Sequence, residues 1–176
     1  MVETATSPGD VTGNVTGAVT GNITQEATQE VIRVMVVDDH DLVRAGVLGL
    51  LGGAAGMQVV GECADGCEVW NKAETSGPNV ILMDIKMPIM SGTAATKDLL
   101  SRNPNIRVLM LTGSISGRTL DEARQAGAAG YLLKGGNPQD LLRAVRVVAA
   151  GGTAWPEGIE TIGSAELKAA TDTLPR

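Results

Sequence analysis

The sequence predicts a doubly wound α/β fold, in which helices cover both faces of a five-stranded parallel sheet. Two observations support this prediction. Short apolar runs of strand length alternate five times with helical segments between residues 31 and 152. Polar residues directly follow several of these runs, at the strand ends where open α/β sheets keep their sites.

The first two strand and helix pairs lie between residues 31 and 78. The apolar run 31–37 predicts a strand. The next segment is predicted to be a helix, because its apolar residues follow helical spacing: Leu42, Val43, Val47, Leu50 and Leu51. Residues 57–62, MQVVGE, predict the second strand. A helix from about residue 66 to 74 should carry Val69 and Trp70 inward before a Gly-Pro pair stops it.

The third pair holds the most informative strand of the chain. Residues 80–84, VILMD, form an apolar run that breaks at Asp84. A helix is expected near 92–102, because an Asn-Pro pair follows it, and the fourth strand is expected at 106–111. Asp84 should therefore lie at the carboxyl end of a buried parallel strand.

The last two helices differ in character. The segment 117–126 has few large apolar residues, which predicts a weakly anchored, mobile helix. A strand at 129–133 follows, and then a helix with Asn137 as its N-cap and Pro138 in its first turn. The apolar face of that helix comprises Leu141, Leu142, Val145 and Val148. We expect the flavodoxin-like strand order 2-1-3-4-5, whose switch point lies between strands one and three.

Polar side chains at the ends of four strands are the candidates for a functional site. Asp38 and Asp39 end the first strand, Asp84 the third, Thr112 the fourth and Lys134 the fifth. Crowded carboxylates repel one another, and Mg²⁺ is the cation that carboxylate oxygens suit. An aspartate can also act as a nucleophile toward phosphorus. Each residue taken singly has a plainer explanation, such as a helix cap or a turn.

Four segments carry a resemblance to a known family: VMVVDDHDLVRAG, ILMDIKMPIMSG, VLMLTG and AAGYLLKG. Together, in this order, they resemble the receiver domain of two-component response regulators over about residues 31–151. The segments DDHDLVRAG and LLRAVRVVAAGG are most similar to the NarL/LuxR-type branch, whose members usually carry a LuxR-type helix-turn-helix effector.

The resemblance implies a role for each acid. Asp84 would accept phosphate from a histidine kinase. Asp39 and Asp84 would bind Mg²⁺ together with the backbone carbonyl of Lys86, and Asp38 would hold a metal-bound water. His40, the sole histidine, is expected at the first turn of a helix near the acids, acting as neither ligand nor phosphate carrier.

The resemblance also implies a conformational switch. Thr112 and Lys134 would bind the phosphoryl group, and Tyr131 would move with Thr112 when the domain switches. The surface thus changed would meet an effector domain or a second copy through helices four and five. One departure is notable: Gly135 follows Lys134, where many receivers have a proline.

Composition limits the other functions. The net charge of −6 and the pI of about 4.8 argue against direct binding of nucleic acid by this chain. The apolar runs are too short to span a membrane, and the start does not resemble a secretory signal, so we expect a cytoplasmic protein. Cys63 and Cys67 fall short of a zinc site and are expected to be free thiols.

The segments before and after the predicted domain bear on how the protein would pass on a signal. Residues 1–30, a loose repeat of Thr, Gly, Asn and Val, predict a flexible low-complexity tail. Residues 152–176 offer no recognition helix, so they predict a linker or a C-terminal tail without a DNA-binding domain. The protein would then control transcription through an effector absent from this chain, or act alone as a single-domain regulator. A metal-dependent phosphatase is less favoured, because Lys86 stands where such enzymes carry a second acid.

Overall fold

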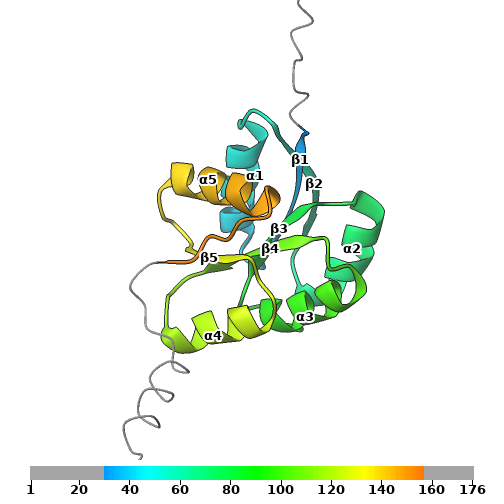
Figure 1. Ribbon diagram of the computed structural model, residues 1–176, viewed down its shortest axis with the longest axis vertical. Coiled ribbons are helices and arrows are strands. Elements are labelled where there is room, and N and C mark those ends of the chain that lie inside the picture. Colours follow the sequence, from blue (N-terminus) through cyan, green and yellow to red (C-terminus); the bar gives the residue numbers. More distant parts are fainter. Residues whose placement is uncertain (1–29, 157–176) are drawn as a thin grey trace, which may run out of the picture.

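The computed structural model describes residues 30–156. The predicted tail up to residue 29 and the predicted linker from residue 157 onward lie outside the described residues. Within them, five strands form one parallel sheet in the order β2-β1-β3-β4-β5. The predicted fold class and strand order are confirmed (Figure 1).

The strands and helices lie within a few residues of the predicted positions. The strands are β1 Ile32–Val37, β2 Met57–Cys63, β3 Val80–Asp84, β4 Arg107–Thr112 and β5 Gly130–Leu133. The helices are α1 Asp41–Gly52, α2 Val69–Ser76, α3 Gly92–Arg102, α4 Gly117–Gln125 and α5 Pro138–Ala149. The segment predicted as one helix from residue 66 begins with a 3-10 turn, Gly66–Glu68, before α2.

The alternation of side chains along the strands builds a core on each face of the sheet. Val34 and Val36 of β1 face α1 and α5, whereas Met35 and Val37 face α2, α3 and α4. Figure 1 shows the two groups of helices on opposite sides of the sheet. Because both faces are covered, the last four residues of β1 and all of β3 are buried.

Helix ends follow the sequence signals. The Asn137 side chain accepts a hydrogen bond from the N–H of Gln139 at 2.9 Å, and Pro138 opens α5, so both predictions are confirmed. In α4, Leu120 and Ala123 are the buried residues, fewer than in α3 or α5. The thin anchoring predicted for α4 therefore matches its burial, and its mobility stays a prediction.

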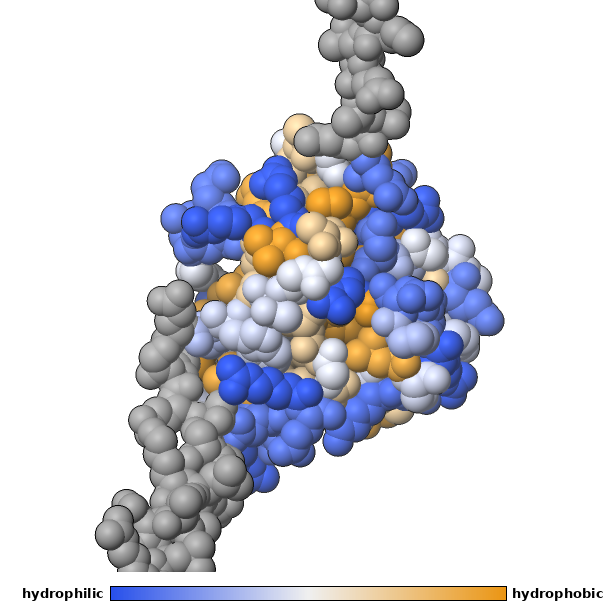
Figure 2. All heavy atoms as spheres, in the orientation of Figure 1, coloured by the Kyte–Doolittle hydropathy of each residue, from blue (hydrophilic) through white to orange (hydrophobic). Residues whose placement is uncertain are grey.

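Leu42 departs from the pattern expected of α1, because its side chain is 90% exposed while Leu51 is fully buried. Neighbouring residues of a helix point about 100° apart, so Leu42 and Val43 cannot both face the sheet. Val43 is the partly buried one. On the face shown in Figure 2, hydrophobic residues reach the surface in patches between hydrophilic ones. None of the helices within residues 30–156 is long and apolar enough to cross a membrane.

Candidate functional site

The site lies at the carboxyl edge of the sheet, where four neighbouring strands end. Asp38 follows β1, and its N–H donates to the carbonyl of Cys63 on β2 at 3.2 Å. Asp84 is the last residue of β3 and pairs with Leu111 of β4. The N–H of Lys134 donates to the carbonyl of Thr112 at 2.7 Å. Parallel pairing therefore brings side chains that are distant in sequence to one edge.

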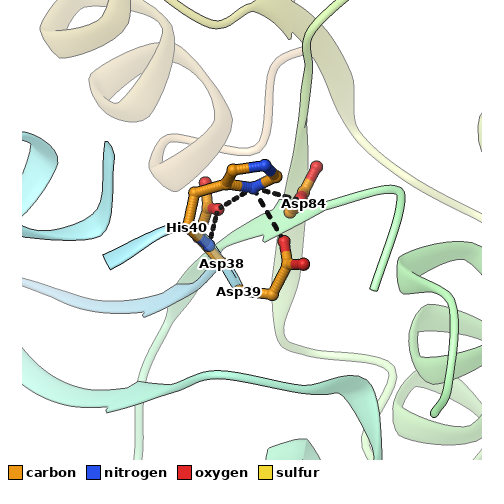
Figure 3. Close-up of side chains that lie close together, drawn as sticks. All are labelled: Asp38, Asp39, His40 and Asp84. Carbon is orange, nitrogen blue, oxygen red and sulfur yellow. Dashed lines mark hydrogen bonds and ion pairs between the residues drawn. The ribbon is translucent and has the colours of Figure 1, made fainter. Parts of the chain in front are cut away.

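Four residues at this edge form a group that could hold a metal ion: Asp38, Asp39, His40 and Asp84. Their ligand atoms all lie within 4.8 Å of one another. The imidazole Nδ1 of His40 lies 2.8 Å from Asp39 Oδ1, 3.4 Å from Asp38 Oδ1 and 4.0 Å from Asp84 Oδ2 (Figure 3). His40 is the N-cap residue of α1 and lies near the acids, where the sequence analysis expected it. The sequence did not indicate that its imidazole contacts the carboxylates.

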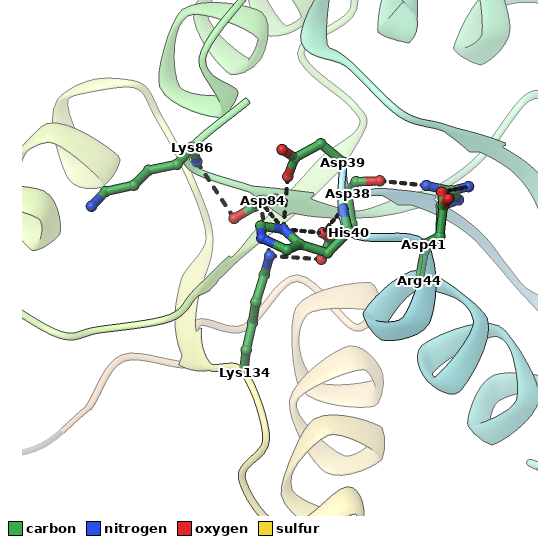
Figure 4. A network of polar contacts seen from close by, with 8 residues as sticks. All are labelled: Asp38, Asp39, His40, Asp41, Arg44, Asp84, Lys86 and Lys134. Carbon is green, nitrogen blue, oxygen red and sulfur yellow. Dashed lines mark hydrogen bonds and ion pairs between the residues drawn. The ribbon is translucent and has the colours of Figure 1, made fainter. Parts of the chain in front are cut away.

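Lys134 forms ion pairs with two of the carboxylates. Its Nζ lies 2.8 Å from Asp84 Oδ2 and 2.8 Å from Asp38 Oδ2 (Figure 4). Asp38 is 1% exposed, and the side chain of Lys134 is 12% exposed. One partly buried ammonium therefore faces two buried carboxylates.

The pKa values reflect this imbalance of charge. Burial raises the pKa of Asp84, the hydrogen bond and charge of Lys134 lower it, and the charge of Asp38 raises it again, so that it stays above its usual value. Burial lowers the pKa of Lys134, but its hydrogen bonds and charge interactions with Asp38 and Asp84 raise it by more. The site holds more negative than positive charge, which favours a further cation.

A buried acid outside the cluster holds the β3–α3 loop, residues 85–91. Asp65 is 6% exposed, and its carboxylate accepts from the N–H groups of Ile89 at 2.9 Å, Met90 at 3.0 Å and Cys67 at 3.1 Å. Burial would raise the pKa of Asp65, but these three hydrogen bonds outweigh it and lower the pKa. Sequence analysis missed Asp65, although an Asp-Gly pair before a helix is a recognisable N-cap signal.

Replacing Asp65 by alanine is expected to lower the free energy of unfolding by about 1–3 kcal/mol, because three backbone N–H groups lose the buried carboxylate that accepts from them. Urea unfolding measures this loss. Amide hydrogen exchange at Ile89 and Met90 should become faster, because the variant no longer ties these amides to the loop before α2.

The pH dependence of the free energy of unfolding is the control for this prediction. The folded-state pKa of Asp65 is lowered, so its stabilisation is present above the unfolded value of about 3.9 and is lost as pH falls through the lower folded value. The variant and the wild type should therefore converge in stability in acid. An unchanged gap between them at low pH would contradict this assignment.

The β3–α3 loop is also closed at its base. The N–H of Gly92 donates to the carbonyl of Ile85 at 3.0 Å. A Cβ on Gly92 would lie 1.9 Å from the carbonyl oxygen of Asp84, so no side chain fits there. Within the loop, the N–H of Lys86 points to Asp84 Oδ1 at 3.4 Å, while the Lys86 ammonium points away from Asp84 (Figure 4).

Thr112 and Tyr131 are linked through one backbone carbonyl. The Thr112 hydroxyl donates to the carbonyl of Ser114 at 2.7 Å, and the Tyr131 hydroxyl donates to the same carbonyl at 3.4 Å. Tyr131 is fully buried, and its hydroxyl lies 2.7 Å from Thr119 Oγ1 of α4. Thr112 also lines a pocket of about 320 Å³ that Asp84 and Lys134 share. The structure thus brings Thr112 to the site and places Tyr131 behind it.

The loop after Lys134 explains one departure noted in the sequence. Gly135 has a φ of 76°, in the left-handed region. Proline is fixed near −65° and cannot adopt this conformation. The chain therefore follows a path from β5 to α5 that excludes proline and favours glycine at this position.

The cysteines take no part in the site. Cys63 and Cys67 are both free, as expected. Burial raises the pKa of Cys63 to about 11, so its thiol stays protonated at neutral pH.

Comparison with known proteins gives consistent matches. A sequence model of the family described as the response regulator receiver domain matches residues 34–146. The response regulator GacA of Pseudomonas protegens is 46% identical over 120 residues, which are 68% of this chain and 56% of that protein. The chain thus spans about half the length of the curated relatives it matches.

Solved structures agree. The signal receiver domain of the response regulator NarL from Mycobacterium tuberculosis superimposes with a TM-score of 0.67 at 35% identity, covering 69% of this chain and 98% of that one. A two-component response regulator of the LuxR family from Aurantimonas sp. SI85-9A1 gives a TM-score of 0.67 at 30% identity, covering 81% and 98%.

Proposed function

Because the chain belongs to the response regulator receiver domain family, we propose that it is a signalling switch that a histidine kinase phosphorylates on Asp84. One observation carries the proposal: Asp38, Asp84 and Lys134 come from three strand ends and meet within 2.8 Å contacts of the Lys134 ammonium. A helix cap or a turn would not require that convergence.

The transfer step follows from the chemistry of these groups. A carboxylate oxygen of Asp84 attacks the phosphorus atom, the new P–O bond forms, and the bond from phosphorus to the donor breaks. The donor keeps that electron pair, and the acyl phosphate forms on Asp84. Lys134 contacts one phosphoryl oxygen and the Thr112 hydroxyl donates to another. Such a transfer depends on positioning and charge neutralisation more than on proton transfer.

The donor atoms present fit Mg²⁺. The buried carboxylates and their surplus negative charge suit a hard cation that prefers oxygen. Asp39 and Asp84 would hold the ion with the backbone carbonyl of Lys86, and Asp38 would orient a bound water. When bound, Mg²⁺ supplies positive charge that offsets repulsion between Asp84 and an incoming phosphoryl group.

Addition of Mg²⁺ is expected to stabilise the protein. A ligand that binds only the folded state at a concentration 100 times its Kd adds about 2.7 kcal/mol to the free energy of unfolding. Thermal unfolding across a Mg²⁺ titration measures the effect. The Asp39→Asn variant should need more Mg²⁺ for the same rise in melting temperature, because it lacks one anionic ligand.

The matched control is Asp98→Asn on α3, which loses a surface carboxylate that pairs with Arg102. Its response to Mg²⁺ should equal that of the wild type, because surface ion pairs contribute little. Equal responses of the Asp39 and Asp98 variants would count against the assigned ligands.

Labelling of the chain with a small phosphodonor tests the function itself. In the presence of Mg²⁺, intact mass should show one added phosphoryl group, and a chelator should prevent the addition. A stable single phosphate supports a switch. Rapid consumption of the donor over many turnovers would instead support a metal-dependent phosphatase, and no addition at all would refute the proposal.

For the output, we propose control of transcription through an effector domain outside this chain, with residues 31–151 as the receiver domain in the cytoplasm. The similarity to a LuxR-family response regulator supports this. Action as a single-domain regulator is the second candidate, with a homodimer through α4 and α5 as one route. A basic helix-turn-helix sequence beyond Arg176 in the parent gene would decide for the effector.

A further inference from the structure

The residues that follow α5 extend the sheet beyond β5. The N–H of Tyr131 donates to the carbonyl of Ala154 at 2.8 Å, and the N–H of Ala154 donates to the carbonyl of Ala129 at 3.0 Å. These bonds make a parallel bridge between Gly130 and Ala154. Residues 152–155, here called the docked segment, therefore cover the free edge of β5.

The β5 edge is shaped for this segment. A Cβ on Gly130 would lie 2.5 Å from the carbonyl oxygen of Ala154, so only glycine allows the approach. At the start of the segment, the N–H of Gly152 donates to the carbonyl of Val147 at 2.9 Å, and Arg107 Nη2 donates to the carbonyl of Gly152 at 3.0 Å. Contacts from β4, β5 and α5 thus fix the path of the backbone.

The far end of the docked segment reaches α4. Trp155 packs against the buried cluster on the α2, α3 and α4 face of the sheet. The Arg124 guanidinium of α4 lies 4.9 Å from the centre of the Trp155 ring, which is a cation–π contact. The segment therefore connects β5 to α4, in which Leu120 and Ala123 are the buried residues.

A continuous series of contacts leads from the candidate site to this segment. The Thr112 hydroxyl is held by the carbonyl of Ser114, which also accepts from the Tyr131 hydroxyl. Tyr131 contacts Thr119 of α4 through its hydroxyl and Ala154 through its backbone N–H. If the Thr112 hydroxyl donates to a phosphoryl oxygen, it must release the carbonyl of Ser114, to which the Tyr131 hydroxyl also donates.

We propose that the docked segment is the output element of this protein, held on β5 and α4 in the unphosphorylated state and released when Asp84 is phosphorylated. This rests on the proposed function. The segment is the last part of the chain that the structure describes, and its release would separate its backbone from β5. The coupling is a shift between two states, docked and released, which phosphorylation of Asp84 biases.

Trp155 provides the measurement. In the Trp70→Phe variant of the full chain, Trp155 is the one remaining tryptophan. Quenching of its fluorescence by acrylamide reports release of the ring. Phosphodonor with Mg²⁺ should increase quenching and shift the docking equilibrium by roughly 5-fold or more. The same chain with Asp84→Asn should show no change.

Intact mass of the same samples separates the two proposals. Phosphate uptake with unchanged quenching of Trp155 overturns the coupling and leaves the proposed function intact. If the chain takes up no phosphate, the proposed function fails and the coupling fails with it.

Variants of the residues that contact the docked segment test its docking in the unphosphorylated protein. Gly130→Ala should displace Ala154 and raise the quenching of Trp155 in the unmodified protein. Because a Cβ there would also lie 2.7 Å from Leu109 Cδ1, Arg124→Gln serves as a second, milder variant. Loss of the cation–π contact should weaken docking about 2- to 5-fold. Arg118→Gln, which alters another arginine of α4, is the matched control.

If Trp155 quenching in both the Gly130→Ala and Arg124→Gln variants equals that in Arg118→Gln, the proposed docking of residues 152–155 on β5 and α4 is wrong. Amide exchange at Tyr131 gives an independent readout, because its N–H is bonded to Ala154. Exchange there should accelerate in the Gly130→Ala chain and stay unchanged in Arg118→Gln.

Discussion

Replacing Asp84 by asparagine is expected to abolish phosphate uptake. The amide oxygen is a poor nucleophile, and the variant keeps the shape of the pocket while losing the reacting oxygen. In the unsubstituted protein Asp38 is paired with Lys134 and only 1% exposed, so it is not placed to replace Asp84. Intact mass after incubation with phosphodonor and Mg²⁺ measures the effect, with Asp98→Asn as the control that retains full uptake.

The free energy of unfolding, measured as a function of pH, tests whether the Asp84 variant is folded. The pKa of Asp84 is raised in the folded state, so between about 3.9 and that higher value the folded protein binds more protons than the unfolded chain. The stability of the wild type therefore falls as pH rises through this range and stays lower above it. Asp84→Asn removes this effect and should be the more stable protein at neutral pH. Phosphate uptake by this variant would contradict the proposed acceptor.

Replacing Lys134 by methionine is expected to have the second largest effect. Methionine keeps the apolar volume of the chain but leaves Asp38 and Asp84 without their shared counter-ion. Removing one partner of a buried ion pair lowers the free energy of unfolding by about 3 kcal/mol. Phosphate uptake should slow by about 100- to 1,000-fold, the cost of losing one preorganised charge at a reacting group.

Urea unfolding and the time course of labelling measure the two effects of the Lys134 variant. Mg²⁺ should restore part of the lost stability, because it also compensates the carboxylates. Lys97→Met on the exposed face of α3 is the matched control and should behave as the wild type. Normal labelling by the Lys134 variant would show that its ammonium plays no part in the transfer.

The fold could be predicted because each element had a strong local signal. The apolar runs of β1, β3 and β4 are buried on both faces, and the caps of α5 are those that the sequence indicates. The site could be predicted for a related reason. Parallel strands place their carboxyl ends at one edge, so strand assignment alone brought Asp84 and Lys134 together.

What could not be predicted depends on side-chain geometry. Arg44 donates to the carbonyl of Asp38 at 2.7 Å and also pairs with Asp41 and Glu62, which joins α1 to β2 and to the residue that follows β1. No periodicity indicates such a contact. Asp65 was missed because two of the N–H groups that donate to it, those of Ile89 and Met90, lie more than twenty residues away in the β3–α3 loop. The docked segment was read as linker because the few residues that pair with β5 carry no strand-length apolar run.

The β3–α3 loop has a consequence for protein engineering. It is fastened at its base by the bond between Gly92 and Ile85, and near its tip by the carboxylate of Asp65. Adding or deleting one residue between these anchors would break one of them. Gly66 belongs with Asp65, because a Cβ on Gly66 would lie 2.4 Å from the carbonyl oxygen of Met90 in this loop. A chimaera that exchanges residues 85–92 together with Asp65 and Gly66 should carry the native loop shape into a related scaffold, whereas the same graft without that pair should not.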